Sequence, residues 1–205
     1  MPFLVLDLEM TGPEPDWNEI IQIGGVLFDD DWSEKGRYLT NVYPENEEAF
    51  SLYSEKVHNL SLKELEDAPM IYDVLPELED WILEKLNIRV PAGQSDKTPY
   101  LKNVIICGQS VINDINFLRE AYRLEKQKWP YSRTLLDTHT LGYFVFRILK
   151  QNGKPVPRGL SLKDIAGYFG LEREDDFHNA LEDAVLTAHC FKEIFKLAHQ
   201  FKVLS

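Results

Sequence analysis

The 205-residue sequence predicts one α/β domain in which a mixed sheet carries helices on its faces. Three strand-like apolar runs occur before residue 44, and helical patterns interleave with two shorter strand-like runs after it. Hydrophobic residues make up 44% of the chain, which is enough for a sizeable core, and no repeat or low-complexity tract interrupts it. We therefore expect a single domain spanning residues 1–205.

The first part of the chain contains three predicted strands. Residues 3–9 form a largely apolar run that predicts a buried strand, and residues 19–28 predict the second strand. Residues 38–43 alternate in polarity and predict a third strand, which ends at Pro44. The three aspartates at 29–31 lie between the second and third strands and indicate a hairpin connection.

The middle of the chain is predicted to be mostly helical. Residues 61–65 begin with a capping-box pattern and predict a short helix. Residues 71–86 repeat apolar side chains at helical spacing, which predicts an amphipathic helix facing a core. Residues 87–102 contain two prolines and a glycine among mostly polar positions and predict a surface loop.

The second half is predicted to hold two more strands and the remaining helices. Residues 104–107 are continuously apolar and predict a central strand, followed by a helix with Ile112, Ile115, Leu118 and Tyr122 on one face. The other predicted elements are an edge strand at 135–138, a helix through 141–148, a basic loop at 151–159, and helices at 161–169 and 180–197.

The sequence lacks the features of secreted and membrane-spanning proteins. It has no positively charged start with a cleavage site, and no apolar stretch approaches the roughly 18–20 residues that span a bilayer. Cys107 and Cys190 are too few for a zinc cluster and are expected as buried free thiols. We expect a soluble, cytoplasmic protein without a membrane partner.

Charge is distributed unevenly along the chain. The net charge of −12 argues against a nucleic-acid partner. Between Arg119 and Lys163, however, ten Lys or Arg face three acidic residues, a net of +7, so the remainder carries −19. A basic sector beside an acidic metal site would suit a polyanion whose end must reach metal ions. A solvated surface with uneven charge explains the same pattern equally well.

Two clusters of acidic residues follow predicted strands. Asp7 and Glu9 are two residues apart on the first strand, so their side chains share one face of the sheet. Asp114 lies one turn into the helix after the central strand, and Ser110 is the expected N-cap, which would place Asp114 near the positive helix end. Solvated acids at a strand end, and simple compensation of a helix dipole, are the alternative explanations.

A third cluster surrounds the start of the last predicted helix. Asn179 followed by Glu182 resembles a capping box, which places Asp183 in the first helical turn and His178 just before the helix. A histidine in that position is often incidental. Carboxylates that converge without balancing Lys or Arg would repel one another unless divalent cations neutralise them. Their hard oxygen atoms suit Mg²⁺ or Mn²⁺, so the three clusters predict metal-assisted phosphodiester cleavage.

These motifs resemble those of the DEDDh 3′→5′ exonucleases, the group that includes bacterial proofreading exonuclease subunits, RNase T and oligoribonuclease. The likeness covers nearly the whole chain. It is carried by Asp7–Gly12, Glu19–Gly24, Val57–Leu60, Asp67–Pro69, Asp114–Leu118, Leu136–Thr138, and His178 with Asp183 and Ala184. Two features depart from the pattern: Gln109 and Ser110 stand where many relatives have His and Asn, and the 87–102 loop is longer than usual.

The resemblance implies an RNase H-like, mixed five-stranded sheet flanked by helices. It also implies that Asp7, Glu9, Asp114 and Asp183 hold two divalent ions, Mg²⁺ or Mn²⁺, and that His178 is the general base. Met10 and Thr11 match positions that hold the terminal nucleotide, and Phe117 matches a position near its base, although a core-facing role is equally expected. The implied substrates are 3′ ends of single-stranded DNA or RNA, hydrolysed to nucleoside 5′-monophosphates.

Two other hypotheses assign a different function to this sequence. The first is a non-catalytic module that binds nucleic acid or a protein partner on the same fold; degenerate members normally lose an acid or the histidine, and this chain has lost none. The second is a nuclease that cuts internally, which a blocked 3′ end would not stop. The choice between DNA and RNA, the biological pathway, the role of the 87–102 loop and the oligomeric state, including a homodimer, stay open.

Overall fold

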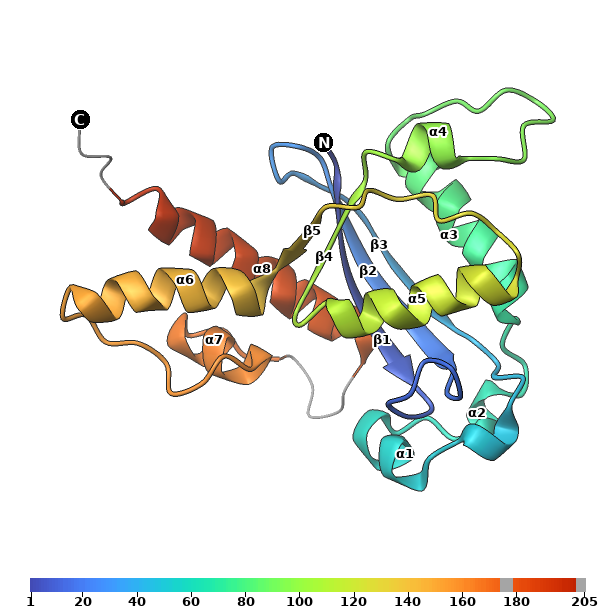
Figure 1. Ribbon diagram of the computed structural model, residues 1–205, viewed down its shortest axis with the longest axis horizontal. Coiled ribbons are helices and arrows are strands. Elements are labelled where there is room, and N and C mark those ends of the chain that lie inside the picture. Colours follow the sequence, from blue (N-terminus) through green and yellow to red (C-terminus); the bar gives the residue numbers. More distant parts are fainter. Residues whose placement is uncertain (174–178, 202–205) are drawn as a thin grey trace.

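The computed structural model describes residues 1–173 and 179–201 and shows a central sheet between two groups of helices (Figure 1). The five strands of the described sheet lie in the order β3-β2-β1-β4-β5. They are β1 (Phe3–Met10), β2 (Ile20–Phe28), β3 (Glu34–Asn41), β4 (Ile105–Gly108) and β5 (Leu135–Asp137). The first three strands form an antiparallel meander, whereas β4 and β5 run parallel to β1. The carboxyl ends of β1, β4 and β5 therefore meet at one edge of the sheet.

The alternating side chains of β1 divide the interior into two cores. Leu4, Leu6 and Leu8 point to one face, where they pack with α3 (Ile71–Lys85) and α5 (Ile112–Leu124). Val5 points to the other face and packs against α8 (Ala180–Ala198). Asp7 and Glu9 follow Val5 on this second face, so the alternation predicted from the sequence is confirmed.

The helices of the α8 side form a layer of their own. The helices α6 (Thr138–Gln151) and α7 (Leu162–Tyr168) pack on α8 through a third apolar cluster that includes Phe146, Ile165 and Ile194. The remaining helical elements of the described residues are short. They are the 3₁₀ turn η1 (Glu47–Ala49), α1 (Leu52–His58), α2 (Leu62–Leu65) and α4 (Thr98–Leu101).

Several local predictions differ from the structure. The third strand begins at Glu34 rather than at residue 38, because its pairing with β2 continues through polar residues on the exposed edge of the sheet. Helix α1 was not predicted; it begins where the Ser51 side chain accepts hydrogen bonds from two backbone amides. Cys107 and Cys190 are buried free thiols, as predicted. Among the described residues, no helix combines the length and apolarity needed to cross a membrane.

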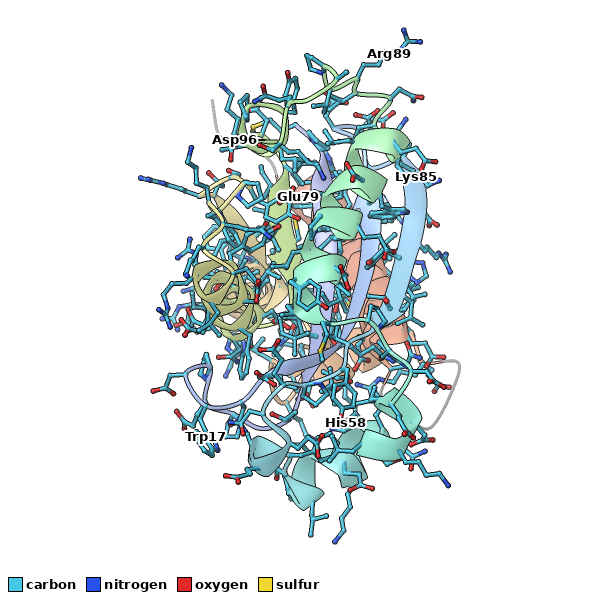
Figure 2. All side chains as sticks on the ribbon, turned by 90° about the vertical axis from the view of Figure 1, so that its right-hand side faces the viewer. Trp17, His58, Glu79, Lys85, Arg89 and Asp96 are labelled. Carbon is cyan, nitrogen blue, oxygen red and sulfur yellow. The ribbon has the colours of Figure 1, made fainter. Side chains whose placement is uncertain are left out.

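The segment predicted as a loop at 87–102 contains α4, and its Lys97 side chain contacts α3. Asp96 accepts a hydrogen bond from the Thr98 amide at the start of α4. Lys97 lies 3.7 Å from the buried carboxylate of Glu79, which also accepts a hydrogen bond of 2.9 Å from the Tyr122 hydroxyl. Figure 2 shows that this region, with Lys85 and Arg89, lies at the end of the molecule opposite Trp17 and His58.

Candidate active site

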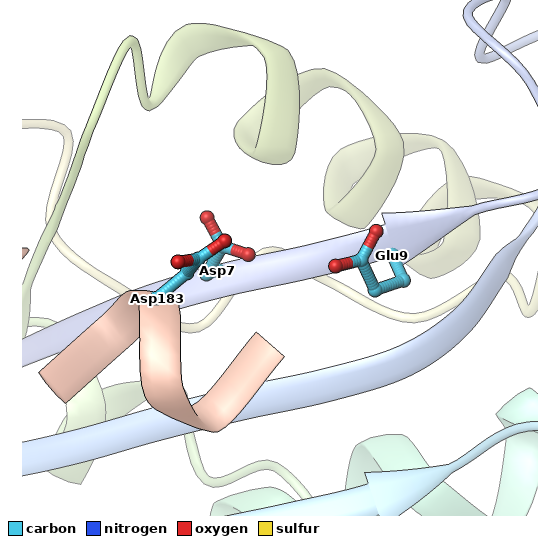
Figure 3. Close-up of side chains that lie close together, drawn as sticks. All are labelled: Asp7, Glu9 and Asp183. Atoms are coloured by element: carbon cyan, nitrogen blue, oxygen red, sulfur yellow. The ribbon is translucent and has the colours of Figure 1, made fainter. Parts of the chain in front are cut away.

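Three carboxylates converge at the carboxyl end of β1. Asp7 and Glu9 come from that strand, and Asp183 comes from the first turn of α8 (Figure 3). Each offers an oxygen atom, and these atoms lie within 4.8 Å of one another. Glu9 and Asp183 are 9% and 5% exposed, so the negative charges are held where water screens them little.

Asp114 reaches the same region from α5. The pairing of β4 with β1 ends at Cys107, and beyond it the Leu8 amide donates a hydrogen bond of 3.1 Å to the Asp114 carboxylate. Asp114 lies in the first turn of α5, as predicted, but the predicted N-cap was wrong. Ser110 adopts a left-handed conformation with φ of 52°, and its amide points to Asp137 at 3.3 Å instead.

The start of α8 is positioned by β2. Asn179 is the N-cap, as predicted, and its side chain accepts a hydrogen bond from the Leu181 amide. The Gln22 side chain accepts a hydrogen bond of 2.9 Å from the Ala180 amide. Gly24, which pairs with Asp7, lies directly under this turn, and a Cβ atom there would overlap the Ala180 backbone. The close approach of strand and helix brings Asp183 to Asp7.

Burial and mutual repulsion raise pKa values in the cluster. Burial is the main cause that raises the pKa of Asp7 well above its usual value, and Asp114, Asp183 and Glu9 add to it. Burial, followed by repulsion from Asp183, raises the pKa of Glu9 to about 7. Burial also raises the pKa of Asp114 to about 7. The site therefore favours added positive charge.

One cation already lies in the site, which corrects the expectation that no Lys or Arg balances the acids. The Arg173 guanidinium pairs with Asp183 through Nε at 2.6 Å and Nη2 at 3.0 Å. Its charge partly offsets the raised pKa values of Asp7 and Glu9. No motif indicated this role, because Arg173 lies in a connecting segment outside the three motifs.

The other predicted site residues have different settings. Thr11 is fully buried, and its hydroxyl oxygen accepts a hydrogen bond from the Glu19 amide while its carbonyl accepts one from Ser51. Met10 is partly buried beside the core, and Phe117 is 4% exposed within it. His178 lies outside the described residues.

Gln109, one of the departures from the family pattern, fixes the surroundings of the site. Its amide nitrogen donates a hydrogen bond of 2.8 Å to the Leu160 carbonyl, and its carbonyl oxygen accepts one from the Thr138 hydroxyl. Gln109 thereby joins the end of β4 to the start of α6 and to the segment before α7. The structural roles of Gln22, Gly24 and Gln109 were not predicted from the sequence, because they depend on contacts between distant segments.

The residues present suit a divalent cation. The donor set is made of carboxylate oxygens, which Mg²⁺ and Mn²⁺ prefer, and Asp7, Glu9 and Asp183 are close enough to share an ion. Because burial and repulsion oppose ionisation of Asp7 and Glu9, bound cations would relieve an electrostatic cost that Arg173 offsets only in part.

Comparisons with known proteins agree with this arrangement. The family model RNase_T, described as an exonuclease, matches residues 4–95. The DNA polymerase III subunit epsilon of Aquifex aeolicus is 28% identical over 95% of this chain and 80% of its own length. The PolC-type DNA polymerase III of Thermotoga petrophila is also 28% identical, over 92% of this chain, but the match covers only 11% of that protein.

Solved structures share the fold. The nuclease domain of 3′hExo, a DEDDh family member bound to rAMP, has a TM-score of 0.73 at 17% identity and covers 100% of this chain and 96% of its own. Exonuclease I of E. coli, in complex with a dT13 oligonucleotide, has a TM-score of 0.74 at 14% identity, over 97% of this chain and 42% of its own. The RNase H-like sheet expected from the motifs is confirmed.

Proposed function

The matched family model and the curated relatives support a DEDDh-type 3′→5′ exonuclease, and from this premise we propose that the chain removes nucleoside 5′-monophosphates from the 3′ end of single-stranded DNA or RNA. The observation that carries the proposal is the convergence of Asp7, Glu9 and Asp183, with oxygen atoms within 4.8 Å of one another. Asp114 is the fourth acid of the proposed site. Its negative charge is one of the causes that raise the pKa of Asp7.

In this proposal the four acids hold two divalent ions. Bound Mg²⁺ or Mn²⁺ would supply the positive charge that promotes ionisation of the attacking water and stabilises the departing 3′ oxygen. Asp7, Glu9 and Asp183 provide the shared ligands, and Asp114 adds a further carboxylate from the neighbouring helix. His178, five residues before Asp183, is the proposed general base that takes the proton of the water.

Residues next to the acids are proposed to receive the terminal nucleotide. Thr11 directly follows β1, and its hydrogen bonds to Glu19 and Ser51 hold this backbone in place. Met10 borders the acids from the end of the strand. Phe117 is buried, so we assign it a supporting contact beneath the nucleotide rather than an exposed stacking surface. A single-stranded end can present its last nucleotide to such a site, whereas the end of a duplex must first open.

The polarity of the reaction is tested with matched oligonucleotides that carry a free or a blocked 3′ end. A free end should be degraded to nucleoside 5′-monophosphates, and a blocked end should remain intact. Cleavage of the blocked strand at internal positions would show an endonuclease instead. Binding of both strands, without products in Mg²⁺ or Mn²⁺, would support a non-catalytic module.

The proposed base is tested separately with His178→Ala. This change should remove most turnover while the affinity for Mn²⁺, measured by calorimetry, stays close to that of the unchanged chain. His139→Ala, at a histidine outside the three motifs, provides the matched control. Loss of Mn²⁺ binding in the His178 variant would contradict its assignment as a base, because a base need not hold the ions.

A further inference from the structure

A long segment without acidic residues stands out in this acidic chain. Residues 138–163 contain five cations and no Asp or Glu, so the segment carries +5. Since the whole chain carries −12, the other residues together carry −17. The five cations are Arg147, Lys150, Lys154, Arg158 and Lys163.

The exposed side of α6 combines part of this charge with aromatic rings. Val145 and Phe146 turn inward and pack on α7 and α8. Tyr143 and Phe144 turn outward and are 56% and 61% exposed. Arg147 and Lys150 are also exposed, one and two turns further along the helix. We call Tyr143, Phe144, Arg147 and Lys150 the α6 basic face.

Acidic neighbours do not neutralise this face. Within residues 1–173 and 179–201, the ion pairs involve neither Arg147 nor Lys150. The described face therefore combines two exposed aromatic rings with two cations that make no ion pair there. The combination suits a polyanion with flat rings, because cations contact phosphates and aromatic side chains stack on bases.

The helix connects this face to the candidate active site. α6 begins at the carboxyl end of β5, at the sheet edge where β1 and β4 also end, and then runs away from it (Figure 1). Its N-cap, Asp137, accepts a hydrogen bond from the amide of Ser110 and acts electrostatically on Asp114. Gln109 bonds to both Thr138 and Leu160, which holds the two ends of this region against β4.

We propose that the α6 basic face binds the part of a single-stranded polynucleotide that lies 5′ of the nucleotide being removed. The helix has 14 residues and a length of about 21 Å, enough to contact several nucleotides. Arg147 and Lys150 contact phosphates, and Tyr143 and Phe144 stack on bases. This inference rests on the proposed function for the direction of the strand, but the binding itself does not require hydrolysis.

The test is binding of a 5′-fluorescein oligothymidylate of about 20 nucleotides, measured by anisotropy. All proteins carry Asp7→Asn, so that the strand is not consumed. The test variant is Arg147→Gln with Lys150→Gln. The control is Lys85→Gln with Arg89→Gln, which makes the same change in net charge at and just after the end of α3, across the sheet from α6 (Figure 1). Equal thermal midpoints establish that both variants are folded.

We expect the test variant to bind at least about tenfold more weakly than the control variant at low salt. The slope of log affinity against log salt should fall by about 1.4, because each lost phosphate contact removes about 0.7 for a single strand. Tyr143→Ser with Phe144→Ser should weaken binding without changing this slope, since stacking releases no counterions.

Equal affinity and equal salt slope in the test and control variants would overturn the proposal. A further readout is oligonucleotide length: the loss in the test variant should grow from about four to about 20 nucleotides, and a loss independent of length would also overturn it. If the α6 variant loses binding as expected but the unchanged chain never hydrolyses the strand, the surface stands and the proposed function fails.

Discussion

The Arg173 guanidinium forms a two-point ion pair with Asp183, the carboxylate through which α8 joins the acids of β1. The pair puts a positive charge beside Asp7 and Glu9, whose pKa values it lowers against the larger effect of burial. Arg173 thus provides part of the neutralisation that divalent cations would complete. The same oxygen atoms of Asp183 serve the arginine and are the ones available to a metal ion.

This relationship predicts that Arg173→Gln strengthens metal binding. Without the guanidinium, a metal ion no longer competes with Arg173 for the Asp183 carboxylate. We therefore expect Mn²⁺ to bind severalfold to about tenfold more tightly, which is the scale of one charge-assisted hydrogen bond. Calorimetric titration measures the change, and Arg119→Gln on α5 is the matched control. Weaker Mn²⁺ binding would mean that Arg173 holds the carboxylate in place for the metal rather than competing with it.

The raised pKa values predict that the metal-free protein loses stability as pH rises. Glu9 and Asp114 have pKa values of about 7 in the folded chain, above the values of about 4 that such acids have when unfolded. The folded state binds more protons between these values, so stability falls from about pH 4 to about pH 7 and then levels off. In EDTA, we expect a thermal midpoint at least about 3 °C lower at pH 8 than at pH 5.

Added metal should reverse this trend. Because ions compete with protons for the same carboxylates, Mn²⁺ should raise the thermal midpoint more at pH 8 than at pH 5. A metal-free midpoint that rises between pH 5 and pH 8, with a pH-independent effect of Mn²⁺, would show that the buried acids do not dominate the titration.

Asp114 accepts a hydrogen bond from Leu8 and also repels Asp7. We therefore predict that Asp114→Asn raises stability and lowers activity. Asparagine keeps an oxygen that accepts from the Leu8 amide but loses the charge that repels Asp7. In EDTA at pH 8 its thermal midpoint should therefore exceed that of the unchanged chain, while nuclease activity falls at least about 100-fold. Asp114→Ala loses the Leu8 hydrogen bond as well and should be about 1–3 kcal/mol less stable than Asp114→Asn. Equal stability of the two variants would contradict this account of Asp114.

The close approach of β2 and α8 predicts a strong effect of Gly24→Ala. The new methyl group would overlap the Ala180 backbone, so the start of α8 must move and carry Asp183 away from Asp7. We expect a loss of about 1–3 kcal/mol in unfolding free energy and weaker Mn²⁺ binding. Gly25→Ala is the matched control, because its nearest contact is the flexible Leu4 side chain at 3.2 Å. Equal effects of the two substitutions, measured by denaturation and calorimetry, would count against the role of Gly24.

The parts of the fold that sequence could predict are those set by local patterns. Alternation along β1 placed Asp7 and Glu9 on one face, and Asn179 correctly marked the start of α8. The edge strand β3 and the cap of α5 were predicted less well, because pairing with β2 extends the strand and a turn at Ser110 replaces the expected cap. Tertiary contacts decide these boundaries.

The site could be predicted only as a set of motifs. Three clusters of acids pointed to a common metal centre, and the structure brings Asp7, Glu9 and Asp183 together. The approach itself depends on Gln22 and Gly24. Both lie in a segment that carries the family resemblance, but their contacts with α8 could not be predicted because α8 is more than 150 residues away, as the Gln22 to Ala180 separation of 158 shows. Arg173 is only ten residues from Asp183, but it lies in a connecting segment outside the three motifs, so no pattern marked its role.

The most direct test of a metal-dependent exonuclease site is a time course on 5′-labelled single-stranded DNA and RNA of equal sequence, in Mg²⁺, Mn²⁺ and EDTA. We expect a ladder that shortens stepwise from the 3′ end and forms only with metal. Asp7→Ala should abolish it at every Mg²⁺ concentration. The faster ladder identifies the preferred sugar. Intact strands in every lane, or a ladder that persists in EDTA or with Asp7→Ala, would contradict the assignment of the four acids as a metal-dependent exonuclease site.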